Sequence, residues 1–180
     1  SNTLTLSRAT SSGSYSVEIP TGTVIQGESD WNGLITLPTV KATPSTTIAG
    51  TPQITIEVGS STVKLTFDKA TKITIPGQAG KNAGYGLNGV FTIINACTAA
   101  QEADPDTLPA GGDCFTTSGT DMIINTKHFT EFVSYTPSSS GGSGGGSSDD
   151  TLIPPAPITG TGLVGGGGGG GGSRATSAGE

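Results

Sequence analysis

Charged side chains are scarce in this sequence: Asp, Glu, Lys and Arg together make up 12% of its 180 residues. Only eight residues are basic, and the formal net charge is −6 at pH 7. Proteins that bind nucleic acid hold the phosphates with clustered lysine and arginine side chains. The lysines here are scattered along the chain, as Lys64, Lys69, Lys72 and Lys81 show. We therefore expect no nucleic-acid partner.

Long apolar runs are absent as well. No stretch of about 18 apolar residues occurs, so the sequence predicts no membrane-spanning helix. Residues that favour helices are few, whereas Thr, Ser and Gly supply most of the polarity. Threonine is β-branched and fits a pleated, half-buried surface, so this composition indicates an all-β protein. The first residues already read as a strand, from which we expect either a cytosolic chain or the mature form of an exported one.

Short runs of alternating apolar and polar residues recur about every ten positions, and turns containing Pro or Gly separate them. They lie at residues 3–7, 15–19, 23–25, 33–40, 53–58, 62–67, 71–75, 90–95, 121–125 and 129–135. This spacing predicts an antiparallel β-sandwich of about 8–10 short strands without a helix. Residues 81–89 are expected to form a Gly- and Asn-rich loop. In the last run, Glu131 and Phe132 break the alternation.

The composition changes abruptly at Pro137. Residues 1–136 are therefore predicted to form the sandwich domain, and residues 137–180 a Gly/Ser/Pro-rich extension that begins with a Ser/Gly linker. The extension also contains an apolar, Pro-rich stretch at 151–164. Its apolar residues include Leu152, Ile153, Ile158, Leu163 and Val164. The extension is either a disordered tail or a segment that a neighbouring subunit orders.

Cysteine is represented by Cys97 and Cys114 alone, on either side of an irregular loop. A disulfide between them would add about 3 kcal/mol of stability in the chain-entropy model. The alternative is a pair of buried thiols. We predict the disulfide, which together with the Thr/Ser/Gly bias favours a secreted or cell-surface location. One histidine and two cysteines cannot complete a typical zinc site without carboxylates.

The loop between the cysteines is acidic. Asp104, Asp106 and Asp113, with Glu102, offer the hard oxygen ligands that Ca²⁺ prefers. Their spacing does not match an EF-hand, and Pro105 interrupts it. A Ca²⁺ site is one interpretation and a solvated acidic loop is the other. We expect no other cofactor.

The only histidine, His128, stands two residues before Thr130. A hydroxyl is a weak nucleophile that needs a nearby base, and imidazole titrates in the suitable range. The triplet His128-Phe129-Thr130 resembles the His-Phe-Ser self-cleavage site of autoproteolytic domains related to ankyrins and netrin receptors. It also resembles the His-Leu-Ser/Thr site of the adhesion-receptor proteolysis module. The resemblance covers residues 92–136 and implies that Thr130 cleaves the Phe129–Thr130 bond. Alternatively, both polar residues are ordinary strand residues.

A wider pattern is similar to modules repeated in microbial surface proteins, where they serve as spacers or structural units. It comprises Leu65-Thr66-Phe67-Asp68, Ile75-Pro76-Gly77, Phe91, Cys97, Cys114 and Lys127-His128-Phe129-Thr130. Two aromatic residues suggest a further function. Trp31, in an acidic turn, and Tyr85, in the Gly-rich loop, are suited to stacking against sugar rings, or else they are core or strand-end anchors.

The sequence thus predicts a non-enzymatic extracellular structural protein, the subunit of a surface filament, pilus-like fibre or surface layer. We expect subunits to join by strand or tail exchange, through Leu4 and Leu6 of the first strand or through the apolar residues of 151–164. Such contacts need not close and can build fibres from copies of one chain. The alternatives are an autoproteolytic module that cleaves between Phe129 and Thr130, and a carbohydrate-binding adhesin domain that uses Trp31.

Overall fold

The computed structural model describes residues 3–11, 13–29, 31–48, 50–59 and 63–138. The chain divides into two units, Ser1–Gly141 and Gly142–Glu180, and each is considered by itself. The second unit lies outside the described residues, and with it the five apolar residues proposed for assembly: Leu152, Ile153, Ile158, Leu163 and Val164.

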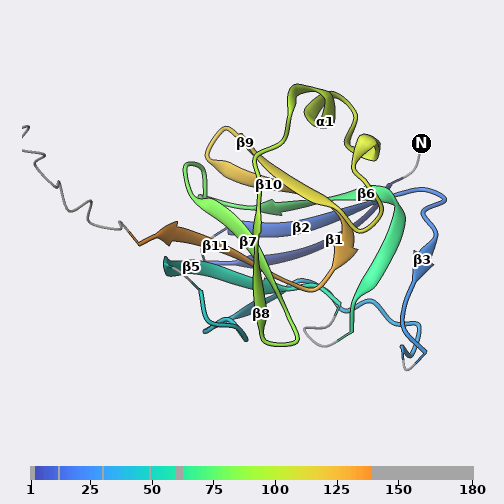
Figure 1. Cartoon of the computed structure of the whole chain (residues 1–180), viewed down its shortest axis with the longest axis horizontal. Coiled ribbons are helices and arrows are strands. Elements are labelled where there is room, and N and C mark those ends of the chain that lie inside the picture. Colours follow the sequence, from blue (N-terminus) through green and yellow to red (C-terminus); the bar gives the residue numbers. More distant parts are fainter. Residues whose placement is uncertain (1–2, 12, 30, 49, 60–62, 139–180) are drawn as a thin grey trace, which may run out of the picture. The chain divides into compact units, whose positions relative to one another are not determined.

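The described residues form an antiparallel β-sandwich of two sheets, as the composition and spacing predict (Figure 1). The first sheet, in the order β1-β2-β6-β10-β9 with β3 beside β6, comprises β1 (Thr3–Thr10), β2 (Gly13–Pro20), β3 (Ile25–Gln26), β6 (Leu65–Ile75), β9 (Asp113–Ser118) and β10 (Asp121–Phe129). The second sheet, in the order β4-β5-β11-β7-β8, comprises β4 (Thr39–Lys41), β5 (Gly50–Glu57), β7 (Asn82–Leu87), β8 (Val90–Ile94) and β11 (Glu131–Pro137).

One apolar core joins the two sheets. In β2 the alternation puts Tyr15, Val17 and Ile19 on the buried face. Both sheets contribute to the same cluster, which includes Ile56, Leu65, Phe67, Ile73, Ile75, Ala83, Ile94, Met122, Ile124, Phe129 and Phe132. Complete burial of a side chain of this size stabilises the fold by roughly 1.5–3 kcal/mol. The alternating pattern in the sequence is therefore the main source of the fold.

The last strand expected from the sequence is in fact two strands in different sheets. β10 ends at Phe129 in the first sheet, Thr130 forms a bend, and β11 begins at Glu131 in the second sheet. Figure 1 shows the chain running from β10 into β11. Phe129 and Phe132 are three residues apart and would face opposite sides of one strand. Both lie in the core because the chain changes sheet between them, which explains the broken alternation.

Three further expectations about strands and loops are corrected. Residues 62–67 and 71–75 contribute to one long strand, β6, and of residues 33–40 only the last two belong to a strand, β4. Residues 81–89 are not a loop: they contain β7, which forms a hairpin with β8. Its turn is Asn88-Gly89, with φ of 51° and 76°, the pair typical of a tight hairpin.

The segment between the cysteines contains the helical turns that the alternation did not predict. α1 (Ala99–Ala103) begins with a capping box in which Thr98 and Gln101 bind each other's backbone amides. A 3₁₀ turn, Pro105–Thr107, follows. A disulfide between Cys97 and Cys114 holds this segment against β9, as predicted. Among the described residues, no helix has the length and apolar character needed to cross a membrane.

We predict that replacing both cysteines by serine lowers the free energy of unfolding by about 3 kcal/mol, because the disulfide closes a loop across 17 residues. The fold should survive, since the main core contains neither cysteine. Denaturant titration of both proteins measures the difference, and wild type in reductant serves as the control. A double variant as stable as wild type would contradict the prediction.

Candidate functional site

The site lies at the end of β10, next to an irregularity in the strand pairing. The pairing of β10 with β6 shifts between Thr126 and His128. The Thr126 hydroxyl satisfies both backbone groups of His128: it accepts from the His128 amide (3.1 Å) and donates to the His128 carbonyl (3.0 Å). Thr126 also pairs with Asp113 across β9. This register brings Asp113 alongside His128.

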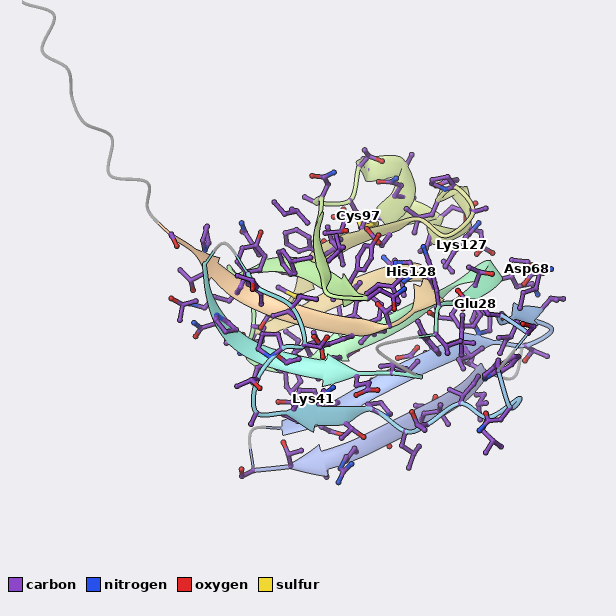
Figure 2. All side chains as sticks on the ribbon, turned by 60° about the horizontal axis from the view of Figure 1, so that its bottom comes forward. Glu28, Lys41, Asp68, Cys97, Lys127 and His128 are labelled. Atoms are coloured by element: carbon purple, nitrogen blue, oxygen red, sulfur yellow. A yellow bond between two sulfur atoms is a disulfide. The ribbon has the colours of Figure 1, made fainter. Side chains whose placement is uncertain are left out.

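The imidazole of His128 is fully buried (0% exposed). Its Nε2 lies 2.8 Å from Oδ2 of Asp113. The Tyr85 ring meets it edge-on, with the centroids 4.5 Å apart, and the Phe132 ring stacks on it at 5.6 Å. Figure 2 shows His128 inside the domain, whereas Lys127 reaches the loop between the cysteines and donates to the Asp106 carbonyl (2.8 Å).

His128 is held as a neutral base. Burial lowers the pKa of His128 below its ordinary value, and this effect outweighs the opposing influence of the Asp113 carboxylate. The positive charge of Lys64 lowers the same pKa further. With Nε2 facing a carboxylate, the proton of the neutral ring belongs on Nε2. Among the described residues Nδ1 has no hydrogen-bond partner, so its lone pair is then available to accept a proton.

Thr130 supplies a hydroxyl at the crossing between the sheets. The residue is fully buried, and its Oγ1 has no hydrogen-bond partner. Its carbonyl accepts from the Val58 amide (3.1 Å), which fixes the backbone to the second sheet. The preceding side chain, Phe129, packs edge-on against Phe67 at 4.5 Å in the core. The buried Thr130 hydroxyl thus stands two residues after the His128 imidazole, whose Nε2 faces the Asp113 carboxylate.

Unsatisfied polar atoms are concentrated at this bend. Among the described residues, four buried side-chain atoms have no hydrogen-bond partner: His128 Nδ1, Thr130 Oγ1, Glu131 Oε2 and Thr46 Oγ1. The first three belong to consecutive or near-consecutive residues, and Thr46 lies beside Gly86, which also adjoins Glu131. In this structure no hydrogen bond joins Nδ1 to Thr130 Oγ1.

The acidic residues considered as Ca²⁺ ligands do not converge. Asp113 faces His128, the Asp104 carboxylate accepts from the Asp106 amide (3.1 Å), Asp106 accepts from the Ala70 amide (2.6 Å), and Glu102 accepts from the Thr116 hydroxyl (2.6 Å). Across the part of the chain that the structure describes, no three His, Cys, Asp or Glu side chains are grouped so that they could hold a metal ion.

The two aromatic residues considered for sugar stacking have different surroundings. The indole of Trp31 donates to the Leu34 carbonyl (2.9 Å) and lines an apolar surface pocket with Val63 and Leu65. The Trp31 ring is thus held by a residue outside the strands, at the protein surface. Tyr85 instead packs beside His128.

Leu4 and Leu6 lie on β1, the strand at one edge of the first sheet. β1 pairs with β2 over eight residue pairs, from Thr3↔Pro20 to Thr10↔Gly13. Leu4 is 57% exposed, whereas Leu6 packs partly against the core. β1 is therefore integrated into its own domain, and in the order of the described strands it forms the edge of the first sheet.

Together these features define an antiparallel β-sandwich domain with a disulfide-linked loop and a buried Asp-His pair at the crossing between its sheets. Compared with family models, curated proteins and solved structures, the chain matches none of them.

The neutral state of buried His128 predicts a pH dependence of stability. Because the pKa of His128 is lower in the folded protein than its ordinary value of 6.5, the unfolded chain binds more protons than the folded protein below about that pH. The free energy of unfolding should therefore decrease as the pH falls through 6.5 toward the folded pKa. Urea titrations at several pH values measure this slope, and His128→Gln, which cannot titrate, should lose that part of it.

Proposed function

We propose that this domain is a self-cleaving extracellular module that cuts its own chain between Phe129 and Thr130 and keeps both parts together. The observation that supports it most is the pairing of buried His128 with Asp113, two residues before a buried hydroxyl that has no hydrogen-bond partner among the described residues. The sequence suggested the triplet, and the register of β9 on β10 adds the third group.

The reaction begins when Thr130 Oγ1 attacks the carbonyl carbon of Phe129. The hydroxyl proton passes to Nδ1 of His128, and a tetrahedral intermediate forms. The intermediate collapses by breaking the C–N bond, and His128 returns the proton to the Thr130 amine. An ester now joins the Phe129 carbonyl carbon to the Thr130 oxygen. Water then cleaves this ester, which leaves a carboxylate on Phe129 and restores the Thr130 hydroxyl.

The surroundings of His128 suit this sequence of proton transfers. The base must be neutral before the attack, and the lowered pKa of His128 keeps it so near pH 7. Asp113, 2.8 Å from Nε2, fixes the ring orientation and stabilises the imidazolium that forms transiently. Loss of a positioned general base typically slows a reaction by about 10²–10⁴-fold.

The architecture supports retention of both fragments after cleavage. β11, which follows the cleaved bond, pairs with β5 on one side and with β7 on the other. Phe132 and Val133 of this strand are fully buried. The shorter fragment would therefore remain bound through two hydrogen-bonded ladders and its core side chains.

We predict that the purified wild-type chain gives two masses in denaturant, corresponding to residues 1–129 and 130–180. Thr130→Val keeps the side-chain shape without the hydroxyl and should leave one intact chain that is still folded, since the lost hydroxyl has no partner. Thr130→Ser should still cleave, and Asp113→Asn should cleave more slowly. A single intact wild-type mass would refute self-cleavage.

A second candidate function is assembly through the edge of the first sheet, favoured by one specific observation. Among the described strands β1 stands at the end of its sheet with β2 as its neighbour, and Leu4 is exposed beside a surface hollow lined by Ile19, Ile25 and Ile35. An extended segment of another copy can complete such an edge, and repeated head-to-tail contacts produce filaments. The disulfide agrees with an extracellular location.

If β1 mediates assembly, Leu4→Lys should abolish it, because a charge on an edge strand opposes pairing with another chain. The exposed side chain can change without loss of the fold. The matched control is Leu37→Lys, which places the same charge at a residue that is 52% exposed and lies outside the strands. Electron microscopy of the three purified proteins decides the matter: dispersed wild-type monomers would refute assembly.

A further inference from the structure

Glu131, the residue after the proposed nucleophile, is a fully buried carboxylate (0% exposed). It is the first residue of β11, and its side chain lies on the face opposite Phe132, away from the core. Its Oε1 accepts from the Ser45 amide (2.7 Å) and from the Ser45 hydroxyl (3.0 Å). The segment after β4 thus covers the outer face of the second sheet at this point.

Lys41 supplies the positive charge that this buried carboxylate requires. Its Nζ lies 2.9 Å from Oε2 of Glu57 and 3.4 Å from Oε2 of Glu131. The hydrogen bond to Glu57, and then Glu131, raise the pKa of Lys41 above its ordinary value, so the ammonium keeps its charge. Glu131 is therefore bound to residues on either side of the 42–44 turn.

β7 contains a glycine where Glu131 needs room. Gly86 pairs with Glu131 across the sheet. A Cβ added at Gly86 would lie 3.2 Å from Oε1 of Glu131 and 2.9 Å from Cγ2 of Thr46. A side chain there would crowd both the carboxylate and the segment that covers it. Gly86 therefore provides a second, independent indication that the chain makes a specific site for the Glu131 carboxylate.

The two ends of the segment 128–131 are consequently fixed in different sheets. His128 is bound to Asp113 of β9 in the first sheet, and Glu131 to Lys41 and Ser45 beside β4 of the second. Only Phe129 and Thr130 lie between them, joined by the bond proposed to break. The position of the Phe129 carbonyl relative to Thr130 Oγ1 depends on both ends being held.

We infer that Glu131 is a positioning residue for self-cleavage, which fixes the Thr130 side of the bond through Ser45 and Lys41 so that the hydroxyl can reach the Phe129 carbonyl. This inference rests on the proposed cleavage. A displacement of about 1 Å between reacting atoms can slow an intramolecular reaction about 10²-fold. Glu131 takes no part in proton transfer, because His128 supplies the base.

The test compares Glu131→Gln with Glu18→Gln in the full chain. Glu18→Gln makes the same change in a carboxylate that is also ion-paired to a lysine, with Lys72 Nζ 2.9 Å from its Oε1, but in the first sheet. Cell-free synthesis under oxidising conditions, followed over time on denaturing gels, gives the cleavage rates. We expect Glu131→Gln to cleave about 10–10²-fold more slowly than wild type, and Glu18→Gln to remain near the wild-type rate.

Two additional measurements separate positioning from general stability. The midpoint of the pH–rate profile should be the same in Glu131→Gln and wild type, because His128 remains the base. Hydroxylamine attacks the ester directly, so it should not restore the rate of Glu131→Gln if the defect lies in forming the ester. Restoration by hydroxylamine would place the defect in ester hydrolysis and overturn the inference.

The remaining outcomes are also decisive. If the Glu131→Gln protein does not fold, Ser45→Ala serves instead, since it removes one hydrogen bond to Glu131 and leaves its charge unchanged. A folded variant that cleaves at the wild-type rate would refute the positioning role while leaving self-cleavage intact. An uncleaved wild-type chain would instead refute the proposed function itself, and the inference with it.

Discussion

The crossing of the chain from one sheet to the other at Thr130 is the constraint on which the rest of the structure depends. β10 and β11 follow each other without a loop, yet they belong to different sheets, so one covalent segment joins both layers of the sandwich. Phe129 and Phe132 anchor the two sides of the crossing in the common core. β11, the strand that follows the crossing, pairs with β5 on one side and β7 on the other, so it is a central strand of the second sheet.

The sequence predicts those strands that bury one face and expose the other, because their residues alternate between apolar and polar. β2 alternates because Tyr15, Val17 and Ile19 all face the core. The same reasoning failed for β7, where Gly84 leaves space for the Phe91 ring and Gly86 for Glu131. Glycine there reflects close approach by residues distant in sequence, so composition alone suggested a loop. It also failed for α1, whose capping box is local but too short for a helical period.

The candidate site was only half visible in the sequence. His128 and Thr130 are two residues apart, and the chemistry of the pair suggests a base and a nucleophile. Asp113 joins them through the register of β9 on β10, which the local pattern of residues does not specify. Glu131 was recognised only as a residue on the wrong face. Its hydrogen-bond partner Ser45 is 86 positions away in the sequence, so this contact is visible only in the folded structure.

The distribution of unsatisfied polar atoms favours a functional origin for this site over a purely structural one. Leaving a buried donor or acceptor unpaired costs about 1–3 kcal/mol, and replacement by an apolar residue of the same shape would remove that cost. Among the described residues the atoms without any polar partner belong to His128, Thr130 and Thr46, at the crossing or beside it, whereas Glu131 Oε2 has its ion pair with Lys41. A requirement for stability alone would favour Val over Thr at position 130. A buried hydroxyl two residues after a buried histidine, each with an unpaired polar atom among the described residues, instead agrees with the self-cleavage that we propose.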